Sequence, residues 1–198
     1  MKHILECAGY EIGKSRRESG HALHWAVRYG HDHIVKWLLD QGANADFVFR
    51  SSRNALPTDR GSTPLQQAAR YGRLNTARVL LEHEADTELR NEQQSRVTAL
   101  HVAVEKCYDS IVSLLLNFDA DFEATSGTPL HYGAQTSHVP VARLLLDRGA
   151  DIEAMINSSG IPTDRREDWA RAGLGERATA LMIAAYYGHY EMAQLLLS

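Results

Sequence analysis

Residues 63–73 read TPLQQAARYGR, and four other stretches of the chain follow the same pattern. They are HALHWAVRYGH at 21–31, TALHVAVEKCY at 98–108, TPLHYGAQTSH at 128–138 and TALMIAAYYGH at 179–189. In every stretch the third residue is leucine, and a pair of leucines follows 15 residues after it. The distances between successive units vary, at 42, 35, 30 and 51 residues. A fixed spacing inside each unit and a variable spacing between units indicate tandem repeats of one small structural unit.

Each unit predicts two short helices. In the first helix, Leu65, Ala68 and Ala69 fall on one face, at the i, i+3 and i+4 positions. The second helix is apolar around most of its circumference, as the stretch 111–116 shows, so it has to be covered on more than one side. A helix of about ten residues is marginal alone in water, and we therefore expect the helix pairs to stack on one another.

The turn between the two helices differs among the units. Gly30, Gly72 and Gly188 are placed to end a first helix in the left-handed conformation, which glycine adopts without strain. Cys107 and Ser137 take this place in the third and fourth units, which predicts strained turns there.

The pattern T-P-L-H-x-A-A-x-x-G-H, followed by L-L and then by G-A-D, resembles the ankyrin repeat. The last part occurs as Gly-Ala-Asn at 42–44, Glu-Ala-Asp at 84–86, Asp-Ala-Asp at 119–121 and Gly-Ala-Asp at 149–151. The resemblance covers about residues 20–198. It implies an all-α, ankyrin-repeat solenoid of stacked helix-turn-helix units, with β-hairpin or loop fingers projecting from one edge.

The expected organisation is five repeats joined by connectors of unequal length. We place the repeats at about 20–46, 61–88, 96–123, 127–153 and 177–198, with long insertions at 45–60 and 154–177. Residues 1–19 are predicted to contain the end of a preceding repeat and a connector. Because neither end carries the polar cap that a solenoid needs, we expect the chain to be a fragment of a longer array in a larger multidomain protein.

Composition narrows the possible partners. The 198 residues include 21 Lys and Arg against 25 Asp and Glu, for a formal net charge of −4. This balance argues against nucleic acid and against a membrane surface, since both attract cationic proteins. Two cysteines cannot form a disulfide framework, and no apolar run approaches the roughly 20 residues that cross a bilayer. We expect an intracellular protein, cytoplasmic or nuclear.

No residue pattern predicts catalysis. The resemblance implies that histidines such as His101 and His131 make local hydrogen bonds at helix starts, so no metal site is expected. The stretch 173–178, GLGERA, matches a loose dinucleotide-binding pattern but lacks the strand and helix that this motif requires. Cys107 lies six residues after His101 but occupies a repeat turn. We expect a non-catalytic module without cofactor, metal or small-molecule substrate.

The resemblance implies that a partner is bound by the fingers and by the two variable residues before each helix-ending turn. These pairs are Arg28 and Tyr29, Arg70 and Tyr71, Glu105 and Lys106, Gln135 and Thr136, and Tyr186 and Tyr187. Tyrosine and arginine are enriched at interface hot spots, which favours this concave surface as the binding site for another protein or another domain of the parent chain. Alternatively, the tyrosines fill space against the next unit, and the chain is a structural spacer or an intramolecular regulatory segment.

Two further features have open interpretations. The insertions carry the aromatic residues Phe47, Phe49 and Trp169, which either contact a partner or cover an exposed edge of the stack. Pairs of polar residues recur at i and i+2 at the start of the connectors, as Asn44 and Asp46, Asp86 and Glu88, Asp121 and Glu123, and Asp151 and Glu153, and all but Asn44 are acidic. These either steer a basic partner or accept local backbone hydrogen bonds in a solvated finger stem.

Overall fold

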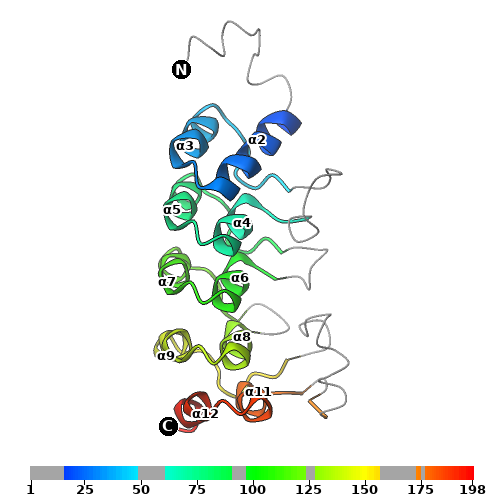
Figure 1. Ribbon diagram of the computed structural model, residues 1–198, viewed down its shortest axis with the longest axis vertical. Coiled ribbons are helices and arrows are strands. Elements are labelled where there is room, and N and C mark those ends of the chain that lie inside the picture. Colours follow the sequence, from blue (N-terminus) through cyan, green and yellow to red (C-terminus); the bar gives the residue numbers. More distant parts are fainter. Residues whose placement is uncertain (1–15, 49–60, 91–96, 124–127, 157–172, 175–176) are drawn as a thin grey trace, which may run out of the picture.

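The computed structural model describes residues 16–48, 61–90, 97–123, 128–156, 173–174 and 177–198, with side chains from residue 19 onward. The first helices of the five units are α2 (Arg16–Tyr29), α4 (Pro64–Arg70), α6 (Ala99–Glu105), α8 (Pro129–Thr136) and α11 (Ala180–Tyr187). The second helices are α3 (Asp32–Asp40), α5 (Leu74–Glu82), α7 (Asp109–Asn117), α9 (Val139–Asp147) and α12 (Tyr190–Leu196). Figure 1 shows the first and second helices as two columns, with the connectors leaving on the side of the first helices.

The expected all-α solenoid is confirmed. Each helix contacts its partner within the unit and the equivalent helix of the neighbouring unit, as α4 does with α5 and α6. The described finger stems form turns and contain no strand, so the expected β-hairpins are not found in these residues. The rest of each finger, at 49–60, 91–96, 124–127 and 157–172, lies outside the described residues.

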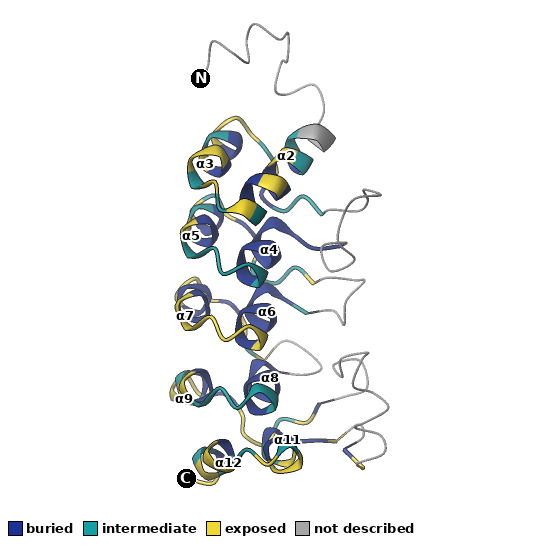
Figure 2. Ribbon diagram, viewed as in Figure 1, coloured by how far each residue is buried: buried dark blue, intermediate teal, exposed yellow. Residues whose placement is uncertain are grey.

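The repeated leucines form one continuous core along the stack. Leu65, Leu100 and Leu130 on the first helices are almost completely buried, and so are their counterparts on the second helices, such as Leu80 and Leu115. Figure 2 shows burial concentrated where the two columns face each other. Each fully buried leucine contributes roughly 1.5–3 kcal/mol, which explains why this residue recurs at the same two positions of every unit.

The turns between first and second helices share one backbone conformation whatever residue occupies them. Gly30, Gly72 and Gly188 have φ values of 71°, 68° and 72°, while Cys107 and Ser137 both have φ of 57°. The left-handed residue lets the next backbone N–H return to the helix, and this bond recurs in all five units at 2.9–3.0 Å. The predicted strain at Cys107 and Ser137 is therefore confirmed. The turn after the second helix adds two further left-handed residues, Glu84 and Asp119, that the sequence analysis did not single out.

The helix starts explain why α2 is longer than the other first helices. Thr63, Thr98, Thr128 and Thr179 precede the first residue of α4, α6, α8 and α11, and each has the extended backbone of a helix cap. Unit one has His21 at this position, and the helix runs through it from Arg16. Histidine has no hydroxyl to cap the helix, and no proline follows it here, so nothing fixes the start of the helix at this position.

Candidate protein-binding surface

A polar side chain on the first helix fastens the connector that follows. In unit two, Gln66 accepts the N–H of Thr63 at 3.0 Å and donates through Nε2 to the carbonyls of Leu89 and Val97, at 2.7 and 3.1 Å. Leu89 and Val97 lie on opposite sides of the connector, so one amide group closes the base of the finger. The side chain is almost completely buried, which makes the bonds costly to lose.

In unit four, His131 fastens the connector as Gln66 does in unit two. Nδ1 of His131 accepts the N–H of Thr128 at 3.2 Å, so the ring proton lies on Nε2, which donates to the carbonyl of Ala178 at 3.2 Å. Ala178 in turn accepts the N–H of Ile156 at 3.0 Å and closes the last insertion. Burial lowers the pKa of His131, although its backbone hydrogen bonds partly oppose this shift. The implied local role of the repeat histidines is confirmed here and at His101, which accepts the N–H of Thr98 at 3.3 Å. In unit one, His24 bonds to the carbonyl of Phe47 in the connector.

The acidic residues of the finger stems form a ladder along the array. We call them the finger-stem edge: Asp46, Asp86, Glu88, Asp121, Glu123, Asp151 and Glu153. Within a unit, the aspartate carboxylate accepts the backbone N–H of the residue two positions later. The distance to this nitrogen is 2.7 Å for Glu88, 2.7 Å for Glu123 and 2.9 Å for Glu153. Between units, the N–H groups of Asp86, Asp121 and Asp151 donate to Asp46, Glu88 and Glu123, at 3.0, 2.9 and 2.9 Å. These bonds favour the interpretation of the acidic pairs as stem residues that hold the backbone.

Phe47 lies against the first helix of its own unit. Its ring fills the space over Gly20, where an added Cβ would come within 2.3 Å of it. It also makes edge contacts with His21 and His24, at centroid distances of 5.5 and 6.0 Å. This position supports the interpretation that the insertion covers an edge of the stack. Phe49 and Trp169, the other two aromatic candidates, lie outside the described residues.

The ten candidate residues before the turns recur at one place on each first helix, and we call them together the first-helix surface. They are Arg28, Tyr29, Arg70, Tyr71, Glu105, Lys106, Gln135, Thr136, Tyr186 and Tyr187. All ten are exposed or half-buried, whereas in units one to four the two residues before each pair are buried; in unit five Ala184 is buried and Ala185 is exposed. Tyr29 is 58% exposed and Tyr186 46% exposed. Tyr187 packs partly against the core and stacks on His189 at 5.8 Å. It therefore fills space within the array and is also partly accessible to a partner.

The chemistry of the first-helix surface changes along the array. In units one and two, the guanidinium of Arg28 lies over the rings of Tyr29 and Tyr71, at 6.0 and 5.3 Å from their centroids. In unit three, Lys106 pairs with Glu105 at 2.8 Å. In unit four, the hydroxyl of Thr136 donates to its own helix. In unit five, the rings of Tyr186 and Tyr187 contact each other edge to face at 5.0 Å.

The structure adds three residues to this surface. Trp25 stacks on Tyr29 at 6.1 Å and is 41% exposed, and Met182 is 51% exposed. Each lies four residues before a tyrosine of the first-helix surface, a helical spacing that the sequence already contained. Arg73 follows the turn glycine of unit two, and its Nε donates to the carbonyl of Arg28 at 3.1 Å. No local sequence signal marks this contact between units.

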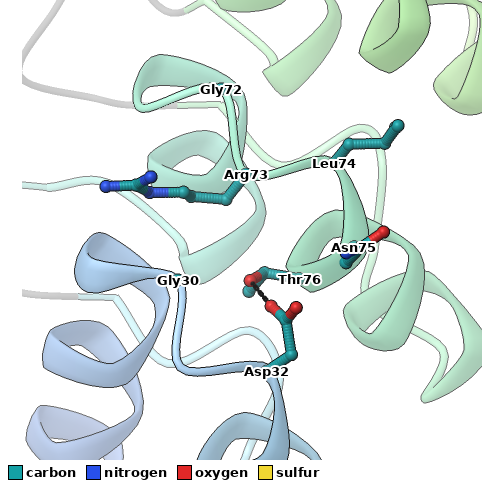
Figure 3. Close-up of a pocket in the computed structure, with 7 residues that line it drawn as sticks. All are labelled: Gly30, Asp32, Gly72, Arg73, Leu74, Asn75 and Thr76. Atoms are coloured by element: carbon teal, nitrogen blue, oxygen red, sulfur yellow. Dashed lines mark hydrogen bonds between the residues drawn. The ribbon is translucent and has the colours of Figure 1, made fainter.

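A hollow of about 360 Å³ lies between the turns of units one and two. Figure 3 shows Asp32 bonded to Thr76 across it and the side chain of Arg73 extended toward the Gly30 turn. Arg73 lies so close to this turn that a Cβ on Gly30 would be 3.1 Å from its Cδ. The hollow thus adjoins the first-helix surface at its arginine-rich end.

The part of the chain that the structure describes holds no cluster of three or more metal-ligating side chains. Among those residues, none of the helices has both the length and the apolar character that a bilayer-spanning segment needs. Cys107 is an exposed free thiol in a turn.

Comparison with known proteins covers almost the whole chain. The family described as "Ankyrin repeats (3 copies)" matches residues 1–91 and 87–156, and the "Ankyrin repeat" family matches residues 176–198. The chain is 32% identical over 139 residues to "Ankyrin repeat and KH domain-containing protein mask-1" of Caenorhabditis elegans, which covers 69% of this chain and 5% of that protein. It is 34% identical over 128 residues to the human "Transient receptor potential cation channel subfamily A member 1", covering 63% of this chain and 11% of the channel.

A third relative, the mouse "Nuclear factor NF-kappa-B p105 subunit", is 30% identical over 174 residues, which is 85% of this chain and 17% of the relative. The chain thus spans no more than about a fifth of the length of these relatives. The matches agree with the stacked helix pairs, the shared turns and the capped first helices. The chain belongs to the ankyrin repeat family.

Proposed function

We propose that this chain is a non-catalytic module that binds a partner protein, or another domain of its parent chain, through the first-helix surface. Ankyrin repeats generally mediate protein–protein interaction, which sets the class of function. The observation that carries the proposal is the contrast between neighbouring positions of the first helix. Ala68 and Ala69 are buried and their counterparts are alanine, valine or glycine in every unit, whereas Arg70 and Tyr71 are half-buried and their counterparts change in charge and size from unit to unit.

Several properties of the surface suit recognition. The side chains come from rigid helices whose positions are set by the core and by the finger-base bonds, so little order has to be gained on binding. Tyrosine and arginine provide large contact areas and several hydrogen-bond donors. The described residues bring together no nucleophile, base and orienting partner, so the proposal needs no catalytic step. The formal net charge of −4 supports a protein over nucleic acid as the partner.

Random peptides displayed on phage provide a direct test. Peptides selected on the chain should lose about tenfold or more in affinity when Arg70→Ala and Tyr71→Ala are combined, with an unchanged circular dichroism spectrum and melting temperature. The matched control combines Arg78→Ala and Glu82→Ala, two exposed positions of α5 in the same unit that do not line the hollow, and should keep full affinity.

Three results contradict the proposal. If the Arg70 and Tyr71 variant unfolds, these residues belong to the core and the surface is wrongly assigned. If the peptides bind both variants as tightly as the original chain, they bind elsewhere. If selection enriches no binding peptide, the alternative of a structural spacer is favoured.

A further inference from the structure

The residue that follows the turn of one unit reaches back to the unit before it. In unit two this residue is Arg73, whose Nε donates to the carbonyl of Arg28 at 3.1 Å. In unit five it is His189, whose Nε2 lies 3.0 Å from the carbonyl of Gln135 and donates to it, since a carbonyl only accepts. Arg28 and Gln135 hold the same position in units one and four, the first of the two variable residues of the first-helix surface. Two different side chains thus make the same bond at two junctions.

The two accepting carbonyls lie at the ends of helices. Arg28 is the next to last residue of α2, and Gln135 is the next to last residue of α8. The last four carbonyls of an α-helix have no partner within the helix, so the donor from the next unit serves a group that the helix itself leaves open. Both donating side chains are half-buried, which shields the bonds in part from water.

Both donors also lie against neighbouring groups that fix their positions. Arg73 lies over the turn of unit one, where a Cβ on Gly30 would be 3.1 Å from its Cδ (Figure 3). The ring of His189 stacks on Tyr187 of its own unit, with 5.8 Å between the centroids and an interplanar angle of 15°. His189 therefore connects the backbone of a surface residue of unit four with a surface side chain of unit five.

The two remaining junctions are built differently. Between units two and three, the ring of Tyr108 covers the turn, and a Cβ on Gly72 would be 2.9 Å from its Cζ. Between units three and four, Nε2 of His138 lies 3.1 Å from Oδ1 of Asp109. Within the described residues, neither side chain bonds to a first-helix carbonyl. The bond to the helix end is therefore particular to the first and fourth junctions.

We propose that Arg73 and His189 are positioning residues of the first-helix surface. Each holds the backbone at a surface residue of the preceding unit and so sets where that residue's side chain begins. This inference rests on the proposed function and adds residues outside the first-helix surface on which binding depends. Binding costs less when the contacting residues are already held in place, so loss of the bond should weaken binding although no contacting side chain is removed.

The binding test uses the phage-selected peptides that depend on Arg70 and Tyr71, at a temperature well below the melting point of every variant. Arg73→Met removes the N–H donors but keeps a long side chain, and it should weaken peptide binding by about threefold or more. Arg73→Lys keeps a donor and should recover part of this loss. The control is Arg78→Met, at an exposed position of α5 in the same unit, and it should change the affinity by less than about twofold.

Hydrogen exchange of the free chain separates positioning from direct contact with the peptide. Arg73→Met should speed up backbone exchange at 28–31, and His189→Phe, which keeps an aromatic ring, should speed it up at 135–138. The matched control is His31→Phe in unit one. The ring of His31 stacks on a tyrosine as that of His189 does, but it makes no hydrogen bond with the described residues, so exchange at 28–31 should not change.

Unchanged exchange at 28–31 in Arg73→Met overturns the inference, and so does unchanged peptide affinity. Weaker binding without faster exchange overturns it as well, because Arg73 would then contact the peptide itself. Equally faster exchange in His31→Phe and His189→Phe would refute the assignment of His189. Failure of the proposed function is a separate result: selection then enriches no peptide, while the exchange measurements, which need no peptide, still show whether the two side chains hold the backbone.

Discussion

At the finger-stem edge, an acidic side chain returns in each of the first four units, and in the first three it accepts a backbone N–H of the next unit. On the first-helix surface of the same repeats, the side chain changes from arginine to glutamate, glutamine and tyrosine. The sequence left two interpretations of the acidic pairs open, a site for a basic partner and a stem that bonds to the backbone, and the bonds between units favour the second. A position that must repeat serves the array, and a position that is free to vary is available for recognition.

The largest expected effect comes from a repeated position in the core. Leu115 is completely buried in the middle unit, and Leu115→Ala should lower the free energy of unfolding by roughly 2–5 kcal/mol. Gln135→Ala, at a variable position of the first-helix surface, should change it by less than about 0.5 kcal/mol. Urea denaturation measures both. An unchanged midpoint for Leu115→Ala would contradict the stacking of the units.

The next effect depends on pH and on His131. Its pKa is lowered in the folded chain from the ordinary value of 6.5, so the unfolded chain binds the proton first as the pH falls. The contribution to stability is complete above 6.5 and is lost as the pH falls from there toward the folded-state pKa, by at most ~1.4 kcal/mol per pH unit.

Unit two supplies the control, because Gln66 makes the equivalent bonds without titrating. His131→Gln should keep most of the stability at neutral pH and show a shallower loss below 6.5 in denaturation curves recorded across this range. Identical pH dependence of the two chains would show that His131 is not held neutral by burial.

The ladder of the finger-stem edge predicts a smaller effect. Glu123→Ala removes the acceptor for the N–H of Asp151 and should cost about 0.5–1.5 kcal/mol, whereas Glu123→Gln retains an acceptor and should cost less. Among the described residues, none is hydrogen-bonded or ion-paired to the carboxylate of Glu153, which is exposed, so Glu153→Ala should be nearly neutral. Thermal unfolding measures these changes. Equal destabilisation by Glu123→Ala and Glu153→Ala would show that the hydrogen bonds between units do not explain the acidic pairs.

The smallest effect concerns the turns. Cys107→Gly relieves a left-handed residue with φ of 57° at the cost of a more flexible unfolded chain, and should stabilise by about 0.5–1 kcal/mol. Gly188→Ala imposes the reverse change at a turn where an added Cβ meets no atom within 4 Å, and should destabilise by a similar amount. Melting temperatures that move in the same direction in both variants would contradict the backbone strain inferred for non-glycine residues in these turns.

The sequence alone predicted the features that recur in several units. The leucine spacing predicted the helix pairs and their stacking, and Cys107 and Ser137 predicted the strained turns, because each follows from a local rule applied several times. The early start of α2 at Arg16 was not predicted, since a missing cap does not say where a helix begins instead. The contact of Arg73 with the Arg28 carbonyl and the position of Arg28 over Tyr71 depend on how two units pack, and no spacing within one unit encodes them.

Hydrogen exchange with and without a phage-selected peptide tests the comparison most directly. If the first-helix surface binds the partner, the peptide should slow backbone exchange at 25–29 and 67–73 and leave the finger stems at 86–88, 121–123 and 151–153 unchanged. Slower exchange confined to the finger stems, with none at the first-helix ends of units one and two, would contradict the account.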